Sequence, residues 1–170
     1  MHSFANWLAG TPPSVALATT SWVVPATQTV HIVAIAILFS SVLMVGLRVM
    51  GWPVRGETPK ASVERFGPWF WAALVVLAIT GTILIVTEPP RELLTISFWL
   101  KMSVLAVGVA IAVLFLRSIH RNADSWERAT GPRRKMMGII TLFVWCLVIV
   151  LGRFIAYDEQ IWGRLSALPN

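Results

Sequence analysis

Charge is scarce in this sequence. Asp, Glu, Lys and Arg make up 13% of its 170 residues, while hydrophobic residues make up 56%; a soluble domain carries about 25% charged residues. This balance excludes a water-soluble globular protein. The single cysteine, Cys146, excludes a disulfide framework within the chain. We therefore expect one small integral membrane domain over residues 1–170.

Proline is absent from the centres of four apolar runs. Each run is long enough to cross about 30 Å of hydrocarbon at about 1.5 Å per residue. Pro25 and Pro68 fall at or just before expected helix starts, and Pro89 and Pro90 end the second helix. The pattern predicts an all-α, four-helix transmembrane bundle with helices at about 26–48, 67–87, 97–117 and 135–156.

Positive charge is unevenly distributed between the loops. Of fourteen Lys and Arg residues, ten lie in the first and third loops: Arg48, Arg55, Lys60, Arg65, Arg117, Arg121, Arg128, Arg133, Arg134 and Lys135. By the positive-inside rule these loops are cytoplasmic, so both termini are expected outside a bacterial inner membrane. Residues 1–25 carry no charged side chain. We expect them to form an interfacial segment on the outer surface, anchored by Trp22.

Several short segments carry a resemblance to a known family. They are residues 4–12 (FANWLAGTP), 22–25 (WVVP), 28–31 (QTVH), Leu47-Arg48 and 152–157 (GRFIAY). With them the chain resembles an uncharacterised bacterial family of small four-helix inner-membrane proteins, which implies the fold but no function. The middle of the chain, Thr80-Gly81 and residues 98–101 (FWLK), is also similar to the copper resistance D membrane domain.

Three ionisable residues inside the apolar runs share one predicted depth. His31 lies 17 residues from Arg48, Lys101 lies 16 from Arg117, and Arg153 lies 18 from Lys135. These separations place all three about 24–27 Å from the cytoplasmic boundary, in the outer leaflet. Tyr157 and Glu88 are expected near the same level.

Two interpretations of this level stay open. In the first, Lys101 and Arg153 extend to the outer headgroups and His31 is a hydrogen-bonded interface residue. In the second, His31, Lys101, Arg153 and Tyr157 form a binding site for a lipid headgroup, a quinone or the propionates of haem, with Glu88 as a candidate counter-ion.

Haem and copper are two further alternatives. His2, His31 and His120 lie at different levels, so His31 and His120 cannot ligate one iron, and only His31 is placed to reach a porphyrin in the membrane. No closely spaced Met and His residues predict a copper site. No catalytic motif or resident metal site is recognised.

The sequence thus predicts a non-enzymatic accessory or scaffold subunit of an inner-membrane complex. Its expected partners are the lipid bilayer and other membrane subunits or further copies of the chain, and not nucleic acid. The alternatives are a haem b electron-transfer subunit and, third, a small transporter related to copper uptake.

Two smaller expectations concern helix packing. Cys146, in the middle of the fourth helix, is expected to be a buried, inert thiol. Small residues four positions apart indicate close helix contacts within the bundle or with another subunit. These residues are Ala36, Ser40, Ala106, Gly108, Ala110 and Ala112.

Overall fold

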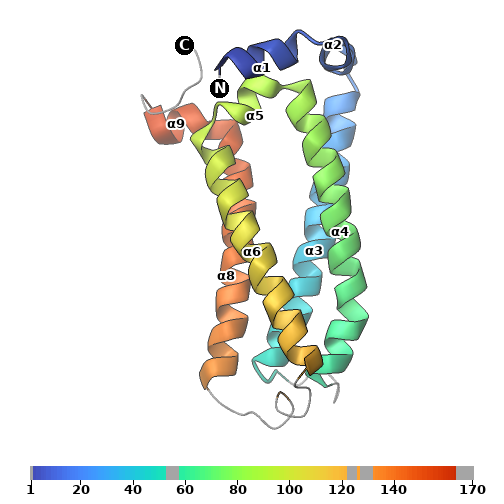
Figure 1. Ribbon diagram of the computed structural model, residues 1–170, viewed down its shortest axis with the longest axis vertical. Coiled ribbons are helices and arrows are strands. Elements are labelled where there is room, and N and C mark those ends of the chain that lie inside the picture. The colour runs from blue at the N-terminus through green and yellow to red at the C-terminus, as the bar shows by residue number, and fades with distance from the viewer. Residues whose placement is uncertain (1, 53–57, 122–125, 127–131, 164–170) are drawn as a thin grey trace.

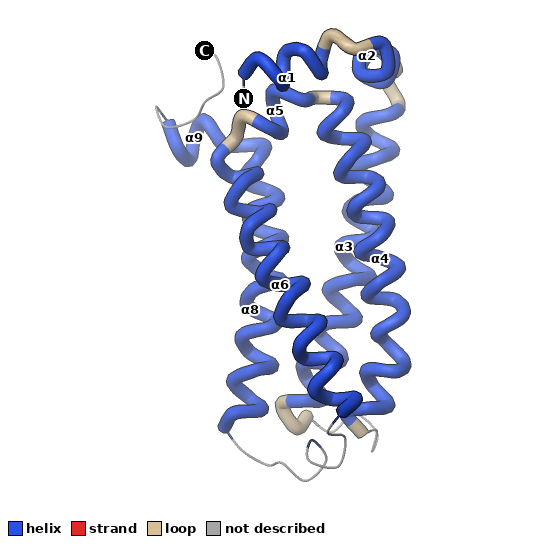
Figure 2. The backbone as a smooth tube through the Cα atoms, viewed as in Figure 1, coloured by secondary structure: helices blue, strands red, loops and turns tan. Residues whose placement is uncertain are grey.

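The described residues of the computed structural model, 2–52, 58–121, 126 and 132–163, contain helices and no strands (Figures 1 and 2). The elements are α1 (His2–Ala9), α2 (Pro12–Thr19), α3 (Val23–Val49), α4 (Pro59–Thr87), α5 (Pro89–Leu93), α6 (Ile96–Arg121), α8 (Pro132–Phe154), the 3-10 turn η1 (Ile155–Tyr157) and α9 (Asp158–Trp162). Four of them, α3, α4, α6 and α8, are long and apolar enough to cross a membrane. This confirms the expected number of spanning helices and indicates a multi-pass membrane protein.

The spanning helices form two pairs, α3 with α4 and α6 with α8, and α8 also packs on α3. Helices α1, α2, α5 and α9 all lie at one end of the bundle, which we call the terminal end (Figure 1). At the opposite end, which we call the basic end, α3 finishes at Arg48 and Val49 and α4 begins. The pairs approach each other at the basic end and separate toward the terminal end, where α1 and α5 extend between them (Figure 1).

Helix α4 begins earlier than the sequence suggests. The Thr58 side chain caps it by accepting a hydrogen bond from Ala61 N at 3.2 Å, and Pro59 occupies the first helical position. Both features favour a helix start. Pro68 therefore lies inside α4 and not at its beginning, so the expectation for this proline was wrong. A spanning helix can tolerate an internal proline when its neighbours compensate the lost hydrogen bond.

The N-terminal residues form two short helices across the terminal end. Gly10 and Thr11 separate α1 from α2. Ser14 is 1% exposed and donates from Oγ to Val86 O at 2.7 Å, which ties α2 to the last turn of α4. Ala5 of α1 is completely buried, while the Trp22 side chain is 69% exposed.

The middle of the bundle is packed around one residue from each spanning helix, which together we call the core layer. Its members are Leu38, Ala73, Gly108 and Trp145. Phe70 packs edge-on against the Trp145 indole, with ring centroids 5.4 Å apart at 87°. Gly108 permits close contact, because a Cβ there would lie 3.2 Å from Val144 Cγ1 and 3.7 Å from the indole.

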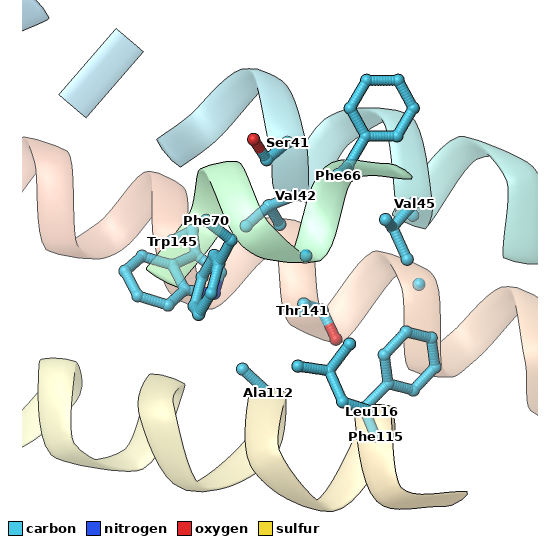
Figure 3. Close-up of a pocket in the computed structure, with 13 residues that line it drawn as sticks. Ser41, Val42, Val45, Phe66, Phe70, Ala112, Phe115, Leu116, Thr141 and Trp145 are labelled. Carbon is cyan, nitrogen blue, oxygen red and sulfur yellow. The ribbon is translucent and has the colours of Figure 1, made fainter. Parts of the chain in front are cut away.

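A small apolar cavity of about 40 Å³ lies next to the core layer, toward the basic end (Figure 3). Trp145 and Phe70 line it, as do four residues that lie seven positions from the core-layer members: Val45, Phe66, Phe115 and Gly138. Seven residues are about two helical turns. The four helices therefore stay in register from one level to the next.

The lipid-facing surface holds the cysteine and part of the small-residue pattern. Cys146 is exposed, which corrects the expectation of a buried thiol. It follows the inward-facing Trp145, and adjacent helical residues point about 100° apart. Gly108 and Ala112 face the bundle interior. The other small residues are exposed: Ala36, Ser40, Ala106 and Ala110.

Candidate functional site

Polar side chains occupy the level seven residues from the core layer toward the terminal end. Each spanning helix contributes one residue to this polar layer: His31 from α3, Thr80 from α4, Lys101 from α6 and Gly152 from α8. Thr80 is 6% exposed, and the other three are half-buried. These are interior positions of the bundle, at which the neighbouring levels carry apolar or small residues.

His31 is held in place by Thr80 across the α3–α4 interface. Its Nδ1 lies 2.7 Å from Thr80 Oγ1, which itself donates to Val76 O at 2.7 Å. The hydroxyl has one hydrogen, so both short contacts are satisfied when His31 Nδ1–H donates to Oγ1. In the neutral ring Nε2 then carries a lone pair. Gly81 lies beside the ring, where a Cβ would be in ordinary van der Waals contact with His31 Cε1 at 3.8 Å.

Lys101 lies along α8 at the same level. Gly152 lies next to this side chain, where a Cβ would be in ordinary van der Waals contact with Lys101, 3.5 Å from both Cε and Nζ. The ammonium is within electrostatic range of His31 and of Glu92 on α5. No described residue forms an ion pair with Lys101. A half-buried cation without a directly bound partner is costly in a membrane interior.

Glu92 was not singled out by the sequence, yet it is the carboxylate that acts on Lys101. Burial raises the pKa of Glu92 from its usual 4.5, while Lys101 and Arg91 lower it and Glu88 raises it. The net direction is upward, so desolvation outweighs attraction to the two cations. Glu92 is thus the carboxylate whose charge acts on Lys101, and burial opposes its own ionisation.

The remaining predicted site residues form separate, exposed pairs. Arg153 Nη2 donates to Tyr157 Oη at 3.3 Å, and the guanidinium lies 5.3 Å from the centre of the Tyr157 ring. Glu88 accepts a hydrogen bond from Arg91 Nη1 at 2.7 Å. Of the five predicted residues, the structure therefore brings His31 and Lys101 together and leaves Arg153, Tyr157 and Glu88 outside the polar layer.

A second polar cluster near the terminal end has a structural explanation. Asp158 is 1% exposed, and its Oδ1 accepts hydrogen bonds from Ser97 N at 3.0 Å and Ser97 Oγ at 2.7 Å. Trp162 Nε1 donates to the same Ser97 hydroxyl at 3.0 Å. These bonds satisfy the start of α6 and attach α9 to it.

The polar layer has few metal-binding groups. Within the described residues no three His, Cys, Asp or Glu side chains come close enough to hold an ion. His31 is the layer's one imidazole. The chemistry available there is one hydrogen-bond acceptor or single metal ligand at His31 Nε2, and one cationic donor at Lys101 Nζ.

A family model covers residues 16–158, from α2 to the first residue of α9, and so includes the whole polar layer. The chain belongs to the family of unknown function DUF6644. This agrees with the resemblance to an uncharacterised family, whereas a similarity to the copper resistance D membrane domain is not shown. No curated protein and no solved structure matches this DUF6644 chain.

Proposed function

We propose that the chain is a non-enzymatic accessory or scaffold subunit of a bacterial inner-membrane complex and that it binds a ligand in the polar layer. The observation that carries this proposal is the pair His31 and Lys101 at interior positions of the bundle. Polar groups at such positions are expensive in a membrane and are retained where they bind something.

The proposed orientation follows from the basic end. Arg48, Lys60, Arg65, Arg117 and Arg121 belong to this end. Cytoplasmic loops carry an excess of Lys and Arg, so the basic end faces the cytoplasm and the terminal end faces outward. The polar layer then lies in the outer leaflet, within reach of amphiphilic molecules dissolved in the membrane.

The donor and acceptor groups discriminate among the candidate ligands. The phosphodiester of a lipid headgroup offers Lys101 an acceptor, but its own oxygens offer His31 Nε2 only further acceptors. A quinol brings both a hydroxyl donor and a ring oxygen acceptor. Haem brings iron to Nε2 and a propionate to Lys101.

Haem b remains a second candidate because of one contact. The Nδ1–H of a metal-ligating histidine usually donates to a fixed acceptor, which orients the ring. The 2.7 Å contact from His31 Nδ1 to Thr80 Oγ1 supplies such an acceptor. The copper interpretation gains nothing comparable, since Met44, Met50, Met136 and Met137 lie toward the basic end of α3 and α8.

The proposal is tested by isolating the full chain from native membranes and measuring co-purified small molecules by mass spectrometry and absorption spectroscopy. We expect Lys101→Met to lose the bound ligand. Arg153→Met is the matched control, because it removes a cation of similar depth that is exposed and paired with Tyr157. Equal retention in both variants would contradict a ligand site in the polar layer.

A further inference from the structure

We infer that the polar layer binds a quinol, whose hydroxyl donates to His31 Nε2 and whose opposite ring oxygen accepts from Lys101 Nζ. This inference rests on the proposed function and names the chemical class of its ligand. It follows from which atoms of the layer are already bonded, which are not, and what lies beneath them.

The first group left without a partner is an acceptor. Thr80 uses its hydrogen on Val76 O and receives Nδ1–H from His31, so both polar atoms of this contact are satisfied. Among the described residues none donates to His31 Nε2. A ligand that fits must therefore bring a hydrogen-bond donor or a metal.

The second group is a donor. Lys101 Nζ forms no ion pair with a described residue. The carboxylate that acts on it electrostatically is Glu92, which is itself desolvated. An ammonium has three donors to satisfy. The ligand must therefore also bring an acceptor oxygen, which a quinol ring carries on the side opposite its first hydroxyl.

The residues beneath these groups are apolar. One turn from the polar layer toward the core layer, each spanning helix contributes a hydrophobic residue: Ala34, Leu77, Leu105 and Val148. Ala34 and Val148 are 4% and 8% exposed, and Leu77 and Leu105 pack against the core. A quinol is a flat, mostly apolar ring with polar atoms at two positions. It matches two polar groups that lie next to a layer of apolar side chains.

Charge favours a quinol over haem. Haem brings two propionates, whereas the polar layer has one cation, because Arg153 is exposed and bound to Tyr157. A quinol is uncharged. It therefore needs no second cation inside the membrane.

The test compares two ligands of nearly the same shape in the full chain reconstituted in lipid nanodiscs. One probe is a ubiquinol with a short alkyl tail, and the other is its di-O-methyl ether, which cannot donate a hydrogen bond. We expect the quinol to bind about tenfold more tightly, because one hydrogen bond to a buried group contributes on this order. Equal affinity for the two probes would overturn the inference.

Variants connect the preference to its residues. We expect His31→Phe to remove the difference between the probes and Lys101→Met to weaken both. Thr80→Val should reduce the preference because His31 loses its orienting acceptor, whereas Thr82→Val should not, since Thr82 is exposed and bonds its own helix at Ala78 O. A preference that persists in His31→Phe would contradict the inferred contact.

Two results would separate this inference from the proposed function. Co-purified phospholipid or a Soret band lost in Lys101→Met, together with no quinol binding, would overturn the quinol and leave the ligand site intact. Absence of any ligand from wild type, with no response to either probe, would overturn both. Comparing the two probes on the wild-type chain needs no variant, so it decides the inference even where His31→Phe fails to fold.

Discussion

Glu92 is a single side chain through which the stability of the chain is expected to depend on pH. It lies on α5, outside the spanning helices, but is half-buried and faces the charge of Lys101, with Arg91 and Glu88 as its other charged neighbours. Burial raises its pKa above 4.5, so the folded state holds the proton more tightly than the unfolded state does. Stability should then fall as pH rises from about 4.5 through the folded-state pKa.

We expect Glu92→Gln to remove this part of the pH dependence and to leave the variant more stable than wild type near neutral pH. The measurement is the thermal unfolding midpoint in nanodiscs from about pH 4 to about pH 7. Glu88→Gln is the control, because Glu88 lies in an exposed pair with Arg91. A wild-type midpoint that rises across this range would contradict the predicted sign.

At the scale of helices, α3 and α8 touch through two glycines near the basic end. A Cβ on Gly138 would lie 2.7 Å from Met50 Cγ and 3.1 Å from Gly46 O. The second contact is with backbone, which cannot move aside as a flexible side chain can. Close approach through glycine is a common way to pack helices in membranes, where little hydrophobic force draws them together.

Gly138→Ala should therefore destabilise the bundle by about 1–3 kcal/mol, the usual range for an overpacked interior. Gly67→Ala is a matched control in α4, since a Cβ there would meet nothing within 4 Å. We expect the control to be neutral or slightly stabilising because alanine favours helix. Both can be compared by denaturant unfolding in the same detergent, and an equal loss in the two variants would show that the contact is unimportant.

On α8, residue spacing predicts depth in the membrane but not the direction of each side chain. Counting residues from Lys135 gave a shared depth for Arg153, but it could not say which way the side chain points. Gly152 faces Lys101, and Arg153, about 100° further round the helix, faces outward. The same rotation separates buried Trp145 from exposed Cys146. The rotation of a helix about its axis depends on the helices it packs against. The sequence of a helix that is apolar on all sides does not show which face is buried.

The polar layer itself left only a partial signal in the sequence. His31 and Lys101 stand out as ionisable residues in apolar runs, and both belong to the layer. Thr80 and Gly152 could be found only by knowing that Trp145 and Ala73 are core positions and stepping seven residues from each. Glu92 lies beyond the expected helices, so its approach to Lys101 depends on the turn through α5.

At the scale of the whole molecule, the number of spanning helices was predictable and their sidedness is testable. With the basic end in the cytoplasm, a periplasm-active reporter fused after residue 170, or inserted at Pro89, should be active. A cytoplasm-active reporter inserted within residues 53–57 should be active, and a periplasm-active reporter there should be inactive. Cytoplasmic activity at both of the first two positions would reverse the orientation and place the polar layer in the inner leaflet.

The hydrophobic clusters join the two helix pairs at levels below the polar layer. Leu38, Ala73 and Trp145 join the two helix pairs at mid-height, and Val49, Val63 and Ile119 pack near the basic end. His31 and Lys101 lie about 10 Å beyond the mid-height contact, on separate pairs. A tilt of about 10° between the pairs would change their separation by about 2 Å, the difference between a hydrogen bond and a gap. The separation of His31 and Lys101 is therefore sensitive to small changes in the angle between the two helix pairs.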